Sequence, residues 1–199
     1  MAKANLAELK TRIAACTVCV ADLPFGPRPV VQFSRTAHIV IVGQAPGRRV
    51  HESGVPFDDP SGDRLRGWLG LDREAFYDAS KLAIVPSGFC YPGTGKSGDL
   101  PPRPECPPTW HEEVFAQLPR ERLTLLLGTY AQKLMLGDDY RGSVTATVEA
   151  WRELVPRYLP MPHPSPRNQR WFKEHPWFEA EVVPRLQRAV AAGRWVDDD

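Results

Sequence analysis

The sequence predicts an α/β fold: a three-layer α/β/α sandwich with a central four-stranded parallel sheet. Short apolar runs bounded by turn residues alternate with segments of helical periodicity, the pattern of strands joined by crossover helices. The runs are mostly apolar, which indicates strands buried on both faces. The 199 residues are 42% hydrophobic and 25% charged, the ordinary balance of a globular protein, and we expect residues 1–199 to form a single domain.

Each element has its own signal in the sequence. The run "AHIVIV" at 37–42 is β-branched and ends at "GQAPG", and the run "RLTLLL" at 122–127 ends at a glycine. The segment "GDRLRGWLG" has helical spacing and closes at a glycine, and the C-terminal segment has an amphipathic pattern. We expect strands at 37–42, 82–86, 122–127 and 157–161, and helices at 5–15, 62–70, 129–136, 145–153 and 174–192.

The 21 prolines concentrate at 92–108 and 156–166, where they stiffen loops that follow predicted strands. The stretch "GQAPG" also follows a strand. Ligands of parallel α/β sheets bind outside the carboxyl ends of the strands. We therefore expect "GQAPG", the 92–108 loop and "HPSPRN" to converge on one edge of the sheet and form the functional site.

Composition excludes some classes of protein. No apolar run approaches the roughly 20 residues of a membrane helix, and "MAKANLAELK" resembles a polar helix start rather than a signal peptide, so we expect a cytoplasmic protein with no membrane partner. A net charge of +1 argues against binding nucleic acid through bulk charge. The same net charge is compatible with DNA binding through a local cluster of positive side chains.

Four cysteines, Cys16, Cys19, Cys90 and Cys106, have a spacing that suggests a metal site. A thioredoxin-like motif would follow a strand, whereas "CTVC" follows a predicted helix. Four thiolates from separate segments suit a tetrahedral zinc ion or an iron–sulfur cluster, and spacing does not separate the two. Four ordinary buried cysteines are the remaining interpretation.

The order of motifs "CTVC", "IVIVGQAPG", "SGVPF", two further cysteines, "LLLGTYAQKLMLG" and "HPSPRN" resembles the uracil-DNA glycosylase superfamily. Within it, the cysteines resemble the branch that carries a four-cysteine [4Fe–4S] cluster. The resemblance covers about residues 10–190. It implies a [4Fe–4S] cofactor, with zinc as the alternative occupant, DNA containing a damaged base as the partner, and a monomer.

The resemblance also implies roles in "HPSPRN". His163 matches the histidine that donates a hydrogen bond to the base carbonyl, so it is a predicted catalytic residue. Ser165 lies where a hydroxyl or amide binds a phosphate, and Arg167 lies where relatives place the side chain that fills the gap in the duplex. Asn168 is grouped with them as DNA-binding.

The first motif and its surroundings supply the rest of the predicted site. Gln44 is the second predicted catalytic residue, able to hold the base or the attacking water through its amide. Phe57 matches the aromatic that stacks on the flipped base, although a core phenylalanine is an equal alternative. Three further base-binding residues are predicted from position: Gly43, Ala45 and Ser87.

Three departures from the family pattern bear on function. Ala45 stands where the best-known members have a water-orienting Asp, and Gln44 stands where the iron–sulfur branch has Glu. The family's base-reading Asn is absent from "VPSGFC", and "HPSPRN" is closer to the single-strand-selective branch. We expect a monofunctional N-glycosylase of base excision repair that acts on uracil or a related deaminated base such as hypoxanthine. The alternatives are an inactive protein that binds damaged bases and an α/β protein acting on free nucleotides.

Overall fold

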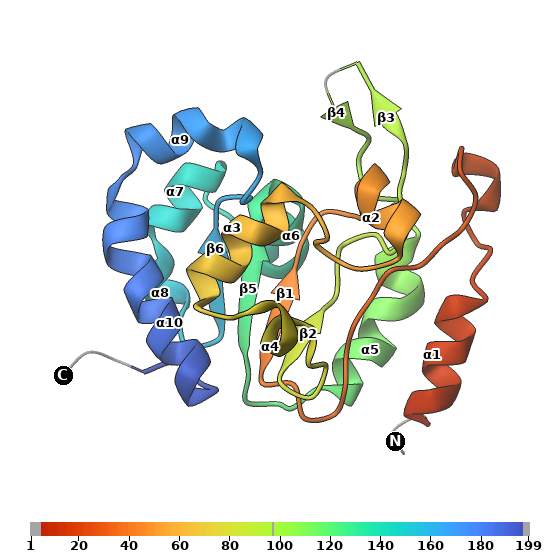
Figure 1. Ribbon diagram of the computed structural model, residues 1–199, viewed down its shortest axis with the longest axis horizontal. Coiled ribbons are helices and arrows are strands. Elements are labelled where there is room, and N and C mark those ends of the chain that lie inside the picture. Colours follow the sequence, from red (N-terminus) through yellow and green to blue (C-terminus); the bar gives the residue numbers. More distant parts are fainter. Residues whose placement is uncertain (1–4, 97, 197–199) are drawn as a thin grey trace.

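A computed structural model describes residues 5–96 and 98–196 and contains the predicted parallel sheet. Its strands lie in the order β2-β1-β5-β6 (Figure 1). Their bounds are β1 Ile39–Val42, β2 Leu82–Ile84, β5 Leu123–Leu127 and β6 Tyr158–Met161. The three pairs are parallel, with Ile39 opposite both Leu82 and Leu123. The predicted fold class is confirmed, and each strand lies within its predicted range.

The strands are buried on both faces because their alternate side chains enter two separate cores. In β1, Ile39 and Ile41 point to one face while Val40 and Val42 point to the other. Both cores are apolar, so the strand has no polar alternation in its sequence. This arrangement is the physical reason for the continuous apolar runs.

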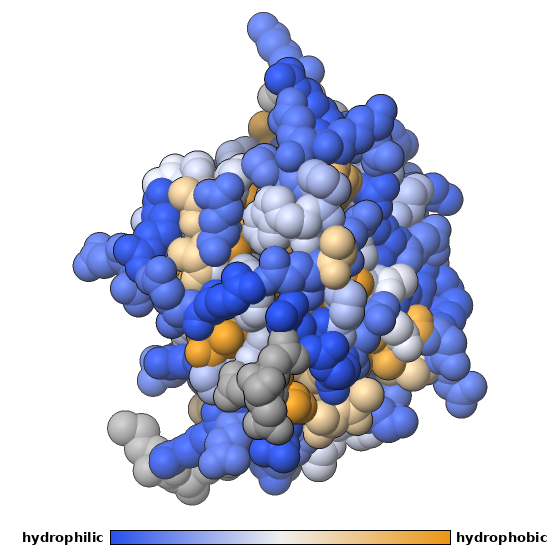
Figure 2. Space-filling view, turned by 90° about the vertical axis from the view of Figure 1, so that its left-hand side faces the viewer, coloured by the Kyte–Doolittle hydropathy of each residue, from blue (hydrophilic) through white to orange (hydrophobic). Residues whose placement is uncertain are grey.

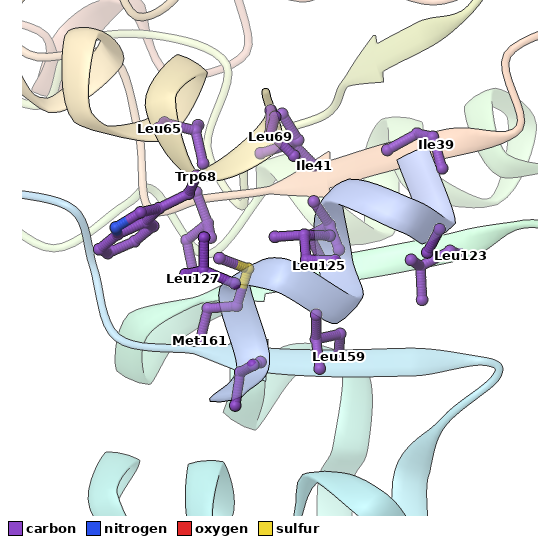
Figure 3. Close-up of a cluster of buried hydrophobic side chains, with 14 of the residues drawn as sticks. Ile39, Ile41, Leu65, Trp68, Leu69, Leu123, Leu125, Leu127, Leu159 and Met161 are labelled. Atoms are coloured by element: carbon purple, nitrogen blue, oxygen red, sulfur yellow. The ribbon is translucent and has the colours of Figure 1, made fainter. Parts of the chain in front are cut away.

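One face of the sheet is covered by α3 (Pro60–Leu69), α4 (Arg73–Tyr77) and α10 (Val183–Ala192). Leu65, Trp68 and Leu69 of α3 pack on the side chains of β1, β5 and β6 (Figure 3). Two short helices, α7 (Val144–Glu149) and α8 (Trp151–Leu154), close the β6 edge through Val148 and Trp151.

The opposite face is covered by α1 (Leu6–Ala14), α5 (Glu112–Gln117) and α6 (Gly128–Leu136). Leu9 and Ile13 of α1 contribute the apolar stripe that the N-terminal pattern predicted, and Val114 of α5 lies beside them in the same core. The result is the three-layer arrangement expected from the sequence (Figure 1).

Several predicted elements are divided or supplemented in the structure. The helix expected at 145–153 is interrupted at Ala150, and the segment expected at 174–192 forms a π-helical turn, Phe178–Val182, that leads into α10. Before it, α9 (Gln169–Glu174) ends just ahead of Pro176, because a proline disfavours the helical conformation of the residue preceding it. The short helix α2 (Arg48–Ser53) was not predicted, since six residues of "RRVHES" carry no helical apolar repeat.

The 92–108 loop contains a small antiparallel hairpin, β3 (Thr94–Gly95) and β4 (Gly98–Asp99). It projects beyond the carboxyl edge of the sheet, at the top of Figures 1 and 2, and its visible surface is hydrophilic. Farther along, the loop forms a π-helical turn at Pro107–His111 that leads into α5. Across the described ranges, none of the helices has the length and apolar character needed to span a membrane.

Candidate active site

A cavity of about 580 Å³ opens at the carboxyl edge of the sheet. Its walls come from the loop after β1, the segment 56–61 before and within the start of α3, the end of β2, the hairpin and the loop after β6. Of the 92–108 loop, Gly98 and Asp99 contribute to the wall. Two of the three predicted loops thus meet directly in this cavity, and the third reaches it through its hairpin.

His163 lies in the cavity wall directly after β6. The backbone N–H of Ser165 donates to its Nδ1 at 3.2 Å, so the proton of the neutral ring belongs on Nε2. The surrounding protein shields the ring from water and lowers its pKa, which the nearby negative charge of Asp59 partly opposes. His163 is therefore a neutral imidazole whose Nε2–H is a hydrogen-bond donor that the loop itself does not use.

Local contacts fix the loop that carries His163. The side chain of Asn168 donates to the His163 carbonyl at 2.8 Å, and the Ser165 hydroxyl accepts from the backbone of Arg167 at 3.2 Å. Gly128, at φ +76°, lies so close that a Cβ there would be 3.2 Å from the Cβ of His163. The predicted DNA-binding residues Ser165 and Asn168 thus also hold the histidine in place.

Arg167 is exposed at the rim and reaches across to the hairpin. A Cβ at Gly98 would lie 2.3 Å from its Nη1, so the guanidinium rests on the hairpin backbone. The structure brings this predicted DNA-binding residue to the mouth of the cavity. It also joins two segments that are about 70 residues apart in the sequence.

The loop after β1 contributes three predicted residues to the wall: Gly43, Gln44 and Ala45. The amide of Gln44 donates to the Leu100 carbonyl at 3.2 Å, tying this loop to the segment after the hairpin. The Gln44 carbonyl accepts from the backbone N–H of Gly88 at 2.9 Å. Gln44 is half-buried at the cavity wall and serves at least as a structural link.

Ser87, predicted to bind the base, has a different position. Its backbone N–H and its hydroxyl both donate to the Gly43 carbonyl at 2.8 Å, and the residue is 3% exposed. The cavity wall at this point is formed by Ile84 and Pro86 instead. Because successive side chains of an extended chain point to opposite sides, Ser87 supports the wall from behind.

Phe57 lines the cavity in an unusual backbone conformation. Its φ of 54° makes it the one non-glycine residue with positive φ in the described part of the chain. A Cβ on Gly62 would lie 1.8 Å from the Phe57 carbonyl oxygen, so the first turn of α3 packs directly on this backbone. The ring meets Phe76 edge-on with centroids 6.2 Å apart. Such strain, about 1–3 kcal/mol, concentrates at functional sites.

The four cysteines line a second, small apolar cavity at the other end of the 92–108 loop. Two N–H groups point at their sulfurs: the Trp110 indole to Cys16 at 3.3 Å and the Phe89 backbone to Cys106 at 3.3 Å. Burial raises the pKa of the Cys90 thiol to about 11 and that of Cys106 to about 12. Such thiols stay protonated and are poor nucleophiles. A bound cation would instead stabilise them as thiolates.

The cysteine cavity has the donor chemistry of a metal site without a metal-binding arrangement of the described side chains. No group of three or more His, Cys, Asp or Glu side chains within 5–96 and 98–196 is arranged to hold a metal ion. In its chemistry alone the donor set is that of a thiolate-ligated centre, since four thiols share one apolar cavity and N–H donors reach the sulfurs of Cys16 and Cys106. Arg103 closes the rim through ion pairs with Asp22 at 2.9 Å and Glu105 at 2.7 Å.

Comparison with known protein families identifies the family to which the chain belongs. Residues 30–187 match the family model described as "Uracil DNA glycosylase superfamily". The chain belongs to the uracil DNA glycosylase superfamily. Membership indicates a DNA glycosylase, a hydrolase that acts on DNA in repair. The matched span includes the whole cavity wall and begins after Cys16 and Cys19.

Several residues that line this cavity were not among the site residues predicted from the sequence. They include Arg49, Asp59, Asp99 and Tyr130. Asp59 precedes the proline that opens α3, and its side chain accepts from the N–H of Gly62 at 2.9 Å. That pattern signals a helix start, and nothing else in the sequence indicates that the carboxylate also faces a cavity.

Proposed function

We propose that the protein is a monofunctional DNA glycosylase that removes uracil or a related deaminated base by hydrolysing its N-glycosidic bond. It would work as a monomer in the cytoplasm on DNA containing a damaged base. The observation that carries the proposal is the neutral His163, whose ring presents an N–H donor in a cavity at the carboxyl edge of the sheet. Both candidate bases leave as anions with a carbonyl oxygen to stabilise.

Bond cleavage leaves negative charge on the base and positive charge on the sugar. A neutral imidazole cannot act as a strong acid, so His163 would donate a hydrogen bond to the base oxygen rather than a full proton. Its loop is already fixed by Asn168 and Ser165, so little reorganisation accompanies the reaction. A preorganised donor of this kind contributes about 10²–10³ in rate.

The base must leave the duplex stack before it can reach this donor. Phe57 supplies an aromatic face in the wall, and its strained backbone is held by the first turn of α3. Base–aromatic stacking contributes about 1–3 kcal/mol per base. We assign Phe57 to stacking on the extruded base, with Gly43 and Ala45 leaving room for close approach.

Arg167 would occupy the gap left in the duplex. It is exposed at the rim, and its guanidinium is held against the hairpin backbone rather than loose in solvent. A guanidinium can stack on bases and pair with phosphates, and its stem fills space. The hairpin would therefore lie beside the DNA strand that enters the cavity.

The cofactor belongs to the same proposal: Cys16, Cys19, Cys90 and Cys106 would hold a [4Fe–4S] cluster, with zinc as the alternative. Bound there, the group would supply cationic charge that stabilises four thiolates in an apolar setting. Its role would be to hold the N-terminal arm and the 92–108 loop together. Iron, zinc and acid-labile sulfide assays on purified protein distinguish the two occupants.

The test is excision on end-labelled oligonucleotides that carry uracil or hypoxanthine, in single- and double-stranded form, followed by alkali. Strand breakage at the modified base is expected with wild-type protein and is expected to be strongly reduced with His163→Ala. An oligonucleotide with thymine in place of uracil is the matched control. Breakage at thymine to the same extent would contradict removal of a deaminated base.

The second candidate function is a protein that binds damaged bases without cleaving. It is favoured by Gln44 and Ala45, which place no carboxylate in the loop after β1. Salt-sensitive binding to uracil-containing DNA with no alkali-labile site would establish it. Absence of DNA binding would instead favour the free-nucleotide interpretation.

A further inference from the structure

Hydrolysis of a glycosidic bond needs a group that accepts a proton from water, and the proposed site lacks one at its expected positions. Gln44 is a neutral amide, and Ala45 has no polar side chain. The two nitrogens of His163 are also assigned, since Nδ1 accepts from Ser165 and Nε2 carries the proton. A proton acceptor must come from another part of the wall.

Two carboxylates line the cavity within the described residues, Asp59 and Asp99. Asp99 lies on the projecting hairpin, is exposed, and accepts from the Thr94 hydroxyl at 3.3 Å. Asp59 is half-buried, two residues after Phe57, on the loop that enters α3. Its greater burial and its closeness in the chain to Phe57 make it the better candidate.

The side chain of Asp59 has one oxygen engaged and one available. Oδ1 accepts from the N–H of Gly62 at 2.9 Å and thereby caps α3. No donor in the described part of the chain contacts Oδ2. The cap holds the carboxylate in one orientation, and its charge is felt at His163, whose pKa it raises against the effect of burial. Asp59 and His163 both line the cavity and therefore face the same space.

We propose that Asp59 is the proton acceptor for the attacking water, a role that rests on the proposed glycosylase function. The bond from C1′ to the base nitrogen breaks, and its electron pair leaves with the base, whose oxygen is held by His163. The water oxygen forms the new bond to C1′. Its proton passes to Asp59 Oδ2 and from there to solvent, while the negative carboxylate also stabilises the positive sugar.

The substitution Asp59→Asn separates this role from helix capping. Asparagine caps a helix about as well as aspartate, so the hydrogen bond to Gly62 is retained while the charge and the basic oxygen are lost. The matched control is Asp72→Asn, because Asp72 caps α4 in the same way, accepting from Ala75 at 2.8 Å, and lies outside the cavity. Both variants are expected to melt close to the wild-type temperature.

Single-turnover excision of uracil from an oligonucleotide is the readout, with DNA affinity measured in parallel. Asp59→Asn is expected to slow excision about 10²–10⁴-fold while leaving affinity within a fewfold, and Asp72→Asn is expected to match wild type.

Two results would overturn the inference in distinguishable ways. Wild-type excision together with an Asp59→Asn variant that excises uracil at the same rate removes Asp59 from the mechanism and leaves the glycosylase proposal intact. A wild-type protein that binds uracil-containing DNA but excises nothing removes the proposed function, and the role of Asp59 with it.

Discussion

The contact between α3 and Phe57 allows a sharp test of how the ring that we propose to stack on the base is held. In Gly62→Ala, the new Cβ would lie 1.8 Å from the Phe57 carbonyl oxygen and 2.7 Å from its carbon, whereas real Cβ contacts stay beyond 3.0 Å. The obstacle is backbone, so Phe57 or the first turn of α3 must move by at least about 1.2 Å. The ring would leave its place in the cavity wall and its edge-on contact with Phe76.

The expected consequences can be measured separately. Overpacking of this kind destabilises a protein by about 1–3 kcal/mol. That range corresponds to a fall in Tm of roughly 2–12 °C for a chain of this size. Excision of uracil should fall further than stability alone explains, because the displaced ring no longer stacks on the base. Binding to undamaged DNA, which needs no extruded base, should change little.

Gly67→Ala provides the matched control in the same helix. Gly67 is exposed, and a Cβ there would meet nothing within 4 Å. Replacing an unobstructed helical glycine by alanine stabilises by about 0.5–1 kcal/mol. Gly67→Ala should therefore melt slightly higher than wild type and excise normally. A Gly62→Ala protein that melts and excises like Gly67→Ala would refute the argument that α3 positions Phe57.

Three further predictions concern the donor, the cysteines and pH. His163→Ala should lower the single-turnover excision rate about 10²–10³-fold with a much smaller loss of DNA affinity; equal losses in both would make His163 a binding residue alone. Cys90→Ser should reduce bound iron or zinc and lower Tm, and a variant that kept full metal content, stability and activity would contradict a structural centre. Burial lowers the pKa of His111 from 6.5 to about 4, so the unfolded chain binds a proton that the folded protein does not between these values. The free energy of unfolding should thus fall by on the order of 3 kcal/mol as pH drops from about 6.5 to about 4, and His111→Phe should flatten this dependence in urea titrations.

The sheet could be predicted because its physical signal is local. Strands buried on both faces are continuous apolar runs; β1 is such a run in full, and β5 is one except for the buried Thr124. The hairpin could not, because its strands are two residues long and are held by pairing and by contact with Arg167 rather than by burial. The short helix α2 escaped prediction for a similar reason: six residues give too few turns for a periodic pattern.

The site was predictable as far as the sheet rule extends. His163 and Gln44 follow strands β6 and β1, and the structure places both in one cavity wall. Ser87 shows a limit of this rule. Its place after a strand does not determine the direction of its side chain, which bonds to the Gly43 carbonyl. Asp59 shows a second limit. In the sequence, the position of Asp59 before Pro60 is fully explained by helix capping. That Asp59 also lines the cavity becomes visible only in the folded structure, where the start of α3 lies at the cavity wall.

The cavity has two walls whose functional side chains are held by different local contacts. Phe57 and Asp59 form one wall, and the same first turn of α3 holds both, by close packing on one and by the cap on the other. His163 stands on the opposite loop, fixed by its own hydrogen bonds. The hairpin connects these parts at the mouth, because its base is bonded to Gln44 and its backbone supports Arg167. Since no single segment carries the ring, the carboxylate and the donor together, a base is engaged correctly only when both walls and the hairpin are in place. A shift confined to the first turn of α3 should therefore impair the proposed stacking and water activation together while leaving the His163 donor unchanged.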